Sequence, residues 1–181
     1  MQSHYFLAVP LSDELKKQIN ESVSKADWPF KSWVHEQDLH LTLVFLGACT
    51  EDQLKDVKKV CNEVVSTWNP FSLELTSFGT FGQKEHPRVF WIGVREEQKL
   101  AGLQHELFRA CSQLGFELDK RAFSPHITVA RKWVSKETYV AQENPTKGQR
   151  WSIDNIVLYK SVVTETPKYK VEQNFKMKDE S

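Results

Sequence analysis

Two short motifs of the same type occur in this sequence, His40-Leu41-Thr42 and His126-Ile127-Thr128. Each lies within a run of apolar and β-branched residues, and such runs are typical of strands. Because side chains alternate between the two faces of a strand, the histidine and threonine of each triplet share one face. Each triplet is therefore expected to present an imidazole beside a hydroxyl, with its apolar neighbours facing the core.

Two such triplets facing each other would make a site with two imidazoles and two hydroxyls. This set is suited to metal-free displacement at phosphorus: one neutral histidine takes a proton from the attacking water or hydroxyl, and the second, protonated, gives one to the departing oxygen. Histidine suits both roles because its reference pKa, about 6.5, leaves both forms accessible near neutral pH. The spacing alone does not decide whether His40 or His126 is the acid.

Arg131 follows the second triplet and could hold the phosphate. Charge accumulates on the equatorial phosphate oxygens in the transition state, and a guanidinium can bond two oxygens at once. In a regular strand, however, Arg131 would point away from Thr128. We therefore expect a bulge, a strand end or the length of the side chain to bring Arg131 to the site.

A structural role is the alternative for either triplet taken alone. A single histidine in a strand is usually a hydrogen-bonded structural residue, and threonine is common in strands. The duplication, and the cost of burying a titratable ring in each of two apolar runs, favour the functional interpretation.

Other kinds of site fit this sequence poorly. The six histidines form no H-E-x-x-H motif, and no Gly-rich phosphate loop occurs. The three cysteines are widely spaced within apolar patterns, which favours small buried side chains in a reducing compartment over a disulfide framework or a zinc knuckle. We therefore expect no metal ion and no other cofactor.

The composition is that of an ordinary globular protein. The chain has 181 residues, of which 40% are hydrophobic and 27% charged, and its formal net charge is zero. This excludes a disordered chain, and the absence of a Lys/Arg excess favours a short nucleic-acid end or a small nucleotide over a long duplex. No run reaches the roughly 18 apolar residues of a membrane span, and the first residues do not resemble a signal peptide. We expect a soluble, cytoplasmic monomer that binds no membrane.

The elements that must position the triplets are interspersed strands and helices. Ser12 is expected to cap one helix, Thr50 and Gln53 to form the capping box of a second, and Gly115 to end a third. Short connections between adjacent strands indicate antiparallel pairing, so the expected fold class is α+β, in one domain over residues 1–175 with a frayed tail at 176–181. Strands are expected at 4–9, at the apolar run 39–46 within the segment 33–47, and at 71–81, 88–94, 123–134, 151–163 and 168–175. Helices are expected from Ser12 through Val23 and at 50–69 and 100–114, and a short helix or turn at 135–142.

The segments around the triplets carry a family resemblance. The chain resembles the two-histidine (2H) phosphoesterases, in particular the bacterial and archaeal RNA 2′,3′-cyclic phosphodiesterases once described as 2′-5′ RNA ligases. The match extends over nearly the whole length, and the two triplets with their flanks are its specific signature. The matching segments are Phe6-Leu7-Ala8-Val9, the run from Asp38 to Gly47, the run from Arg88 to Gly93, the run from Arg121 to Arg131, and Leu158-Tyr159-Lys160-Ser161.

The resemblance implies a two-lobed fold with pseudo-twofold symmetry, in which antiparallel sheets line a central groove and helices lie outside. It implies metal-free hydrolysis of a terminal 2′,3′-cyclic phosphate to a 2′-phosphate, with 2′-5′ ligation as the reverse reaction. By position, His40 matches the general acid that protonates the leaving 3′ oxygen, and His126 matches the base that activates water. Thr42, Thr128 and Arg131 match the phosphate contacts.

Further residues and functions remain as alternatives. Phe45 and Tyr159 lie near the matched motifs and are candidates for stacking on a nucleobase. Many relatives carry arginine where this chain has His4, and we expect His4 to be structural. The same groove could belong to a non-catalytic module that binds RNA ends or nucleotides, or to a phosphodiesterase for a 2′-5′ oligonucleotide or an ADP-ribose cyclic phosphate.

Overall fold

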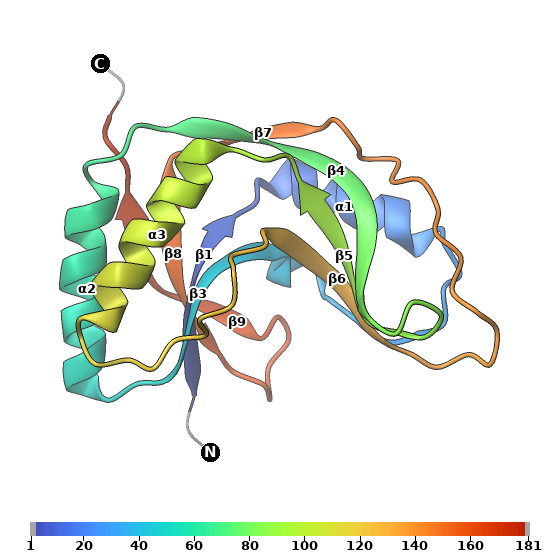
Figure 1. The fold of residues 1–181 in the computed structure, drawn as a ribbon, viewed down its shortest axis with the longest axis horizontal. Helices are drawn as coiled ribbons and strands as arrows, with labels where there is room; N and C mark the ends of the chain where they lie inside the picture. The colour runs from blue at the N-terminus through green and yellow to red at the C-terminus, as the bar shows by residue number, and fades with distance from the viewer. Residues whose placement is uncertain (1–2, 180–181) are drawn as a thin grey trace.

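The computed structural model describes residues 3–179 and confirms the α+β class. Helices are interspersed among the strands up to α3, and the chain after α3 contains only strands among its described helices and strands (Figure 1). In chain order the elements are β1 (His4–Pro10), α1 (Asp13–Ser24), β2 (Phe30–Trp33), the short 3₁₀ helix η1 (Glu36–Asp38), β3 (His40–Ala48), α2 (Glu51–Val65), β4 (Phe71–Gly82), β5 (Pro87–Val94), α3 (Gln98–Ser112), β6 (His126–Trp133), β7 (Arg150–Ile153), β8 (Asn155–Ser161) and β9 (Tyr169–Lys176).

The strands form one open antiparallel sheet in the order β7-β4-β5-β6-β3-β1-β8-β9, with β2 paired to β6. We call the strands β2, β4, β5, β6 and β7 the β6 half, and β1, β3, β8 and β9 the β3 half. The register between β3 and β6 joins the two halves through a single pair, Leu41 with Ile127. The sheet is therefore continuous, but its two halves are joined at this junction by only one pair of residues in register.

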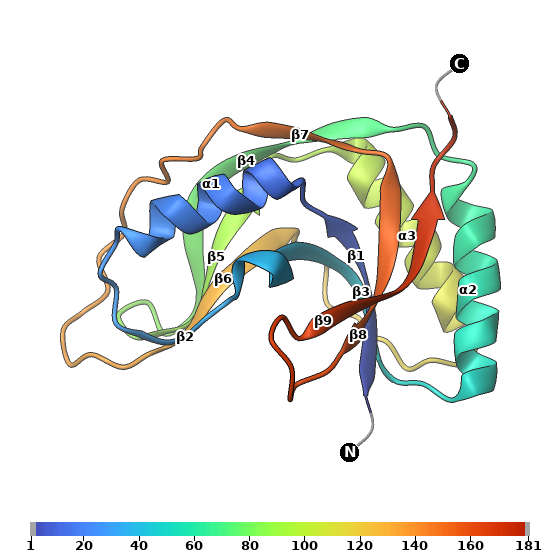
Figure 2. The same ribbon diagram turned by 180° about the vertical axis from the view of Figure 1, so that it is seen from behind.

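The three helices pack against the main core through apolar stripes. Ser12 and Thr50 cap α1 and α2 as expected, and Gln53 completes the capping box of α2. In Figures 1 and 2, α2 and α3 lie beside each other near the β3 half, while α1 lies near the β6 half. The helical residues that enter the core are Leu15, Ile19 and Val23 from α1, Val57, Cys61 and Val65 from α2, and Leu100, Leu103, Leu107 and Cys111 from α3.

Two expected strands differ in the structure, whereas the run 39–46 is confirmed as β3. The strand expected from Phe123 begins only at His126, after Pro125. The segment 151–163 divides at Asp154 into β7, which pairs with β4, and β8, which pairs with β1. The division coincides with Asp154 and Asn155, which interrupt the apolar pattern between the two strands.

Two further expectations concern the chain after β6 and after β9. A short helix or turn was expected at 135–142; these residues form no helix but a bend at 136–137 and irregular chain, and Tyr139 donates its backbone N–H to Glu85 O. The frayed tail was predicted from Lys176, but Met177 is 4% exposed, and the N–H groups of Met177 and Lys178 bond to Asp154 O and Trp68 O. Residues 176–178 therefore belong to the packed body; residues 180–181 lie outside the described part of the chain. Among residues 3–179, no helix is long and apolar enough to cross a membrane.

Candidate active site

The two triplets meet at the junction between the halves of the sheet. Leu41 and Ile127 are antiparallel partners, so the chain runs in opposite directions through the two motifs, and the position of His40 lies opposite that of Thr128. Leu41 and Ile127 are both fully buried in the main core. Because side chains alternate, both histidines and both threonines occupy the other face of the sheet, related by a pseudo-twofold axis between the two central residues.

The two imidazoles are oriented in the same way. The Nδ1 of His40 lies 2.7 Å from Asp38 O, and the Nδ1 of His126 lies 2.8 Å from Ser124 O. Because a carbonyl oxygen only accepts, each Nδ1 carries the proton of the neutral ring and each Nε2 is the basic nitrogen. The Nε2 of His40 lies 2.9 Å from Thr42 Oγ1, whose hydroxyl can donate to it.

The surroundings of His40 favour its neutral form. The ring centroids of Phe6 and Tyr169 lie 4.9 and 5.1 Å from that of His40. Desolvation by burial lowers the pKa of His40 to about 4, although the hydrogen bond and the charge of Asp38 act in the opposite direction. The positive charges of His126 and Arg131 lower the pKa of His40 further, which places both groups within electrostatic reach of the ring.

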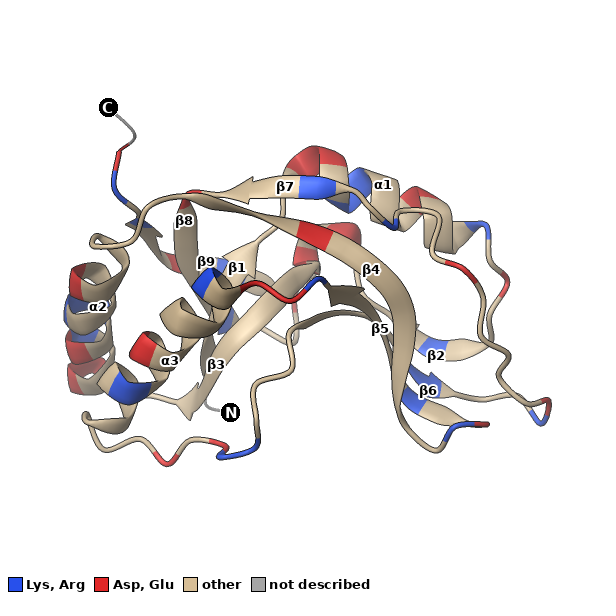
Figure 3. Ribbon diagram, turned by 45° about the horizontal axis from the view of Figure 1, so that its top comes forward, with Lys and Arg blue, Asp and Glu red and all other residues tan. Residues whose placement is uncertain are grey.

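A β-bulge, one of the three routes considered for Arg131 from the sequence, lies between Thr128 and Arg131 in β6. Along β6, Thr128 pairs with Trp91 and Ala130 with Phe90, so Val129 has no partner of its own. Val129 and Ala130 are both buried while Arg131 is exposed, which returns the guanidinium to the face of Thr128. Figure 3 shows basic residues on β6 and on its neighbour β2.

The same bulge occurs in β3 and places Phe45. Ala8 pairs with Thr42 and Leu7 with Val44, so the residue between them, Leu43, is the extra one. Phe45 is 56% exposed and occupies, after the first triplet, the position that Arg131 occupies after the second. The site thus has an aromatic ring at one pseudo-equivalent position and a cation at the other.

Tyr159, the second stacking candidate, is less available. Its side chain is 8% exposed and packs against Phe6 with ring centroids 5.4 Å apart. Little of the ring remains for a nucleobase, and the structure gives Tyr159 a packing role beneath His40.

Several residues beside the triplets were not identified from the sequence. Phe81 and Trp91 lie next to His126, with ring centroids 4.9 and 6.0 Å from it. Trp91 packs so closely over Gly79 that a Cβ there would collide with the indole. The opposition of Trp91 and Thr128 in the register explains this placement, and no local pattern in the sequence predicts it. Phe6 and Tyr169, which lie beside His40, were likewise not identified as site residues from the sequence.

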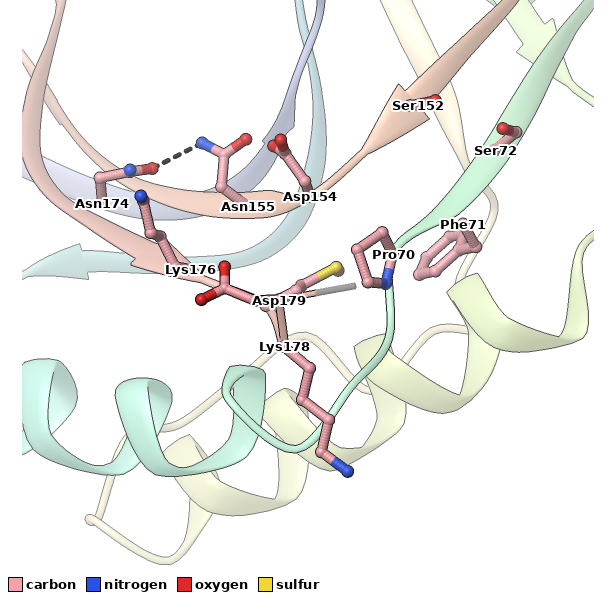
Figure 4. Close-up of a pocket in the computed structure, with 11 residues that line it drawn as sticks. Pro70, Phe71, Ser72, Ser152, Asp154, Asn155, Asn174, Lys176, Lys178 and Asp179 are labelled. Carbon is pink, nitrogen blue, oxygen red and sulfur yellow. Dashed lines mark hydrogen bonds between the residues drawn. The ribbon is translucent and has the colours of Figure 1, made fainter. Parts of the chain in front are cut away.

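A cavity of about 550 Å³ lies elsewhere, where β7, β8 and the end of β9 meet the start of β4 (Figure 4). Its lining combines acidic and basic side chains, including Asp154, Lys176 and Asp179, and includes no residue of either triplet. Within residues 3–179, no group of three or more His, Cys, Asp or Glu side chains is arranged to hold a metal ion.

Comparisons of the sequence give one consistent family. The family model of the 2′-5′ RNA ligase superfamily matches residues 11–165. The chain is 42% identical over 173 residues to an RNA 2′,3′-cyclic phosphodiesterase of Geobacillus stearothermophilus, covering 93% of this chain but only 55% of that protein. It is 31% identical over 171 residues to a protein of the same name from Bacillus subtilis, covering 93% of each chain.

Solved structures have the same fold. TT0787 of Thermus thermophilus superimposes with a TM-score of 0.83 at 26% identity, covering 98% of this chain and 100% of that one. Escherichia coli LigT complexed with 3′-AMP gives a TM-score of 0.84 at 23% identity, covering 99% of this chain and 100% of LigT. With two pseudo-symmetric H-x-T triplets on one face of the sheet and a family match over most of its length, the chain belongs to the 2′-5′ RNA ligase superfamily.

Proposed function

We propose that this protein is a phosphodiesterase that opens the 2′,3′-cyclic phosphate of an RNA end or a small nucleotide to a 2′-phosphate, with His40 and His126 as the acid–base pair. The observation that carries the proposal is the pairing of Leu41 with Ile127, which sets the two imidazoles on one face in opposite directions. In each ring Nδ1 donates to a carbonyl, which leaves Nε2 as the basic nitrogen. The names of the curated relatives agree with this reaction.

In the proposed reaction, a water molecule attacks phosphorus on the side of His126 and the bond from phosphorus to the 3′ oxygen breaks on the side of His40. Nε2 of His126 takes the proton of the water, and Nε2 of His40 gives a proton to the 3′ oxygen, leaving a 3′-hydroxyl. The hydroxyls of Thr42 and Thr128 and the guanidinium of Arg131 stabilise the charge on the non-bridging oxygens. No step in this scheme requires a metal ion. Its reversal would re-form the cyclic phosphate and release water, so the 2′-5′ ligation expected as the reverse reaction instead requires the 5′-hydroxyl of a second strand to attack phosphorus in place of water.

The acid role of His40 must be reconciled with its lowered pKa. At a pKa of about 4, the ring is mostly neutral near pH 7. A phosphodiester carries a negative charge, and an adjacent anion favours the protonated imidazole, so we propose that substrate binding and proton uptake by His40 are coupled. The opposite assignment, with His40 as base and His126 as acid, requires no such uptake and is separated from the first by the experiments described below.

We assign recognition of the nucleobase to Phe45. Its ring is exposed on the same face as the triplets, one bulge beyond Thr42, and a base can stack on an exposed aromatic side chain. A monomeric state and a cytoplasmic location stay predictions of the sequence.

The proposal is tested by incubating the protein with 2′,3′-cyclic nucleotides and with oligoribonucleotides that end in a cyclic phosphate, in the presence of EDTA. We expect a 2′-phosphate product and a bell-shaped dependence of kcat/KM on pH. His40→Ala and His126→Ala should each abolish turnover, while His105→Ala, which changes an exposed histidine on α3, should not. Tight binding without turnover in the wild type would instead identify a non-catalytic module. Activity that persists in both triplet variants would exclude the acid–base pair.

A further inference from the structure

We propose that Asp38 is a positioning residue for His40: its backbone carbonyl orients the imidazole, and its buried carboxylate holds Tyr169 against the same ring. The proposal rests on the proposed function for its catalytic consequence. The contacts themselves are independent of that function, so the two can fail separately.

The carboxylate of Asp38 is held entirely inside the protein. Asp38 is the last residue of η1 and is 3% exposed, the one buried carboxylate among the described residues. Its Oδ2 accepts the backbone N–H of Lys168 and its Oδ1 accepts that of Tyr169, both at 3.1 Å. Burying a charged carboxylate is costly unless it is hydrogen-bonded, and here both oxygens are satisfied by the chain at the start of β9.

These two hydrogen bonds determine where Tyr169 lies. Tyr169 is the first residue of β9, and its ring meets His40 edge-on at a centroid distance of 5.1 Å and an interplanar angle of 89°. The same ring meets Phe6 at 5.0 Å and 84°. Asp38 therefore contacts His40 from two directions, directly through the 2.7 Å bond from Nδ1 to its carbonyl and indirectly through Tyr169.

The other half of the site has only the first of these contacts. Ser124 stands in the equivalent position, and its carbonyl accepts from Nδ1 of His126 at 2.8 Å, but Ser124 is exposed and carries no charge. The titratable and charged groups that face His40 are Asp38 of η1, Tyr159 of β8, Tyr169 of β9, and His126 and Arg131 of β6.

Among these groups, Asp38 alone supplies a carboxylate. Its negative charge partly offsets the desolvation that lowers the pKa of His40. The pseudo-symmetric site is thereby made unequal, because His40 has a buried carboxylate beside it and the equivalent position before His126 is Ser124.

The first experiment follows the imidazole signals of the whole protein by NMR as pH is varied, in wild type and in Asp38→Asn. The asparagine keeps the size of the side chain and removes its charge. We expect the titration midpoint of His40 to fall in the variant and that of His126 to stay unchanged. Asp52→Asn, which removes an exposed carboxylate from α2, serves as the matched control and should move neither midpoint. An unchanged His40 midpoint in folded Asp38→Asn would overturn the proposal, whether or not the protein is an enzyme.

The second experiment measures hydrolysis of a 2′,3′-cyclic nucleoside monophosphate across pH. Misplacement of a catalytic group acts on turnover, so we expect kcat of Asp38→Asn to fall by about tenfold or more with little change in KM. With His40 as the acid, the alkaline limb of the kcat profile should also move to lower pH. Movement of the acidic limb instead would support positioning by Asp38 but make His40 the base. A uniform loss of kcat with both limbs unmoved would indicate a purely structural role and contradict the proposal.

Tyr169 provides a second test if Asp38→Asn does not fold. Tyr169→Phe keeps the ring that contacts His40, whereas Tyr169→Leu removes it and leaves Asp38 in place. We expect wild-type kcat in Tyr169→Phe and a reduced kcat in Tyr169→Leu, with a changed titration of His40 only in the latter. Wild-type behaviour of both variants would show that Tyr169 does not hold the ring, and the proposal would be wrong.

Discussion

At the scale of single residues, the site depends on how two chemically identical side chains become different. Both imidazoles use Nδ1 to bond a carbonyl two residues earlier, but only His40 is packed against Phe6 and Tyr169 and has a buried carboxylate nearby. Burial lowers the pKa of His40 and Asp38 opposes the change. The balance of these two effects, rather than the motif itself, sets the protonation of the ring.

The lowered pKa of His40 predicts a pH-dependent stability. Between the folded value of about 4 and the unfolded value near 6.5, the unfolded chain binds more protons, so the free energy of unfolding should fall as pH falls through this window. The loss is on the order of 1–3 kcal/mol and should be complete below the folded pKa. Chemical denaturation of wild type and His40→Gln at a series of pH values measures it, because the variant lacks this contribution. Parallel curves for the two proteins between pH 4 and 6.5 would contradict the prediction.

At the scale of elements, matching bulges in β3 and β6 explain how a strand motif delivers three side chains to one face. A regular strand would turn Phe45 and Arg131 away from the threonines that precede them. In each strand the extra residue, Leu43 or Val129, is buried and restores the third side chain to the face of the site. The two strands therefore use one geometry to present a ring at one end and a cation at the other.

This arrangement predicts that substitutions of Phe45 and of Arg131 weaken the binding of different ligands. Phe45→Ala should weaken binding of a cyclic-phosphate-ended oligoribonucleotide by about 1–3 kcal/mol, the usual value of one stacked base, and leave binding of inorganic phosphate unchanged. Phe45→Tyr keeps the aromatic face and serves as the control. Calorimetric titration with both ligands measures the difference. Equal weakening of both ligands by Phe45→Ala would assign the ring a structural role.

Arg131 should give the opposite pattern because it acts on charge. Arg131→Gln is expected to weaken inorganic phosphate and oligonucleotide alike, and to reduce the dependence of binding on salt. Lys132→Gln removes a neighbouring exposed cation of β6 and is the matched control. If Arg131→Gln bound phosphate as tightly as wild type, the guanidinium would not be a phosphate contact.

At the scale of the whole molecule, the two halves of the sheet must stay in a fixed relative position so that both triplets can contact the same phosphate. Direct pairing between β3 and β6 is limited to Leu41 and Ile127. The relative position of the halves therefore depends largely on the packing of buried side chains in the main core. The helices of the two halves contribute to the same core, which joins the halves on the face away from the site.

Loss of packing at the junction should therefore affect activity as well as stability. Ile127→Ala is expected to cost about 2–5 kcal/mol in the free energy of unfolding and to reduce kcat of the folded protein. Leu103→Ala on α3 also truncates a fully buried side chain and should cost a similar free energy, with kcat retained. Denaturation and steady-state kinetics at a temperature where both variants are folded compare the two. A retained kcat in Ile127→Ala would show that the halves do not depend on this pair.

Local patterns in the sequence determined much of the fold and part of the candidate site. Alternation in the strands indicated that each triplet shares a face with its hydroxyl, the caps at Ser12 and Thr50 were identified from residue type, and short connections indicated an antiparallel α+β fold. Alternation also indicated that a regular strand would turn Arg131 away from Thr128, and the structure has a bulge between them. These features depend on the residue itself and on neighbours a few positions away, which is why they can be derived without coordinates.

Tertiary structure alone decided the rest, because it depends on contacts between distant segments. Nothing near Asp38 in the sequence indicates that its carboxylate will bond the backbone at residues 168 and 169, or that Tyr169 will close on His40. The division of one apolar run at Asp154 and the docking of Met177 have the same origin, since each was decided by which partner strand or loop supplied the hydrogen bonds. The sequence by itself specified two equivalent histidines, and only the folded chain made them unequal, because burial and a fixed charge act through space.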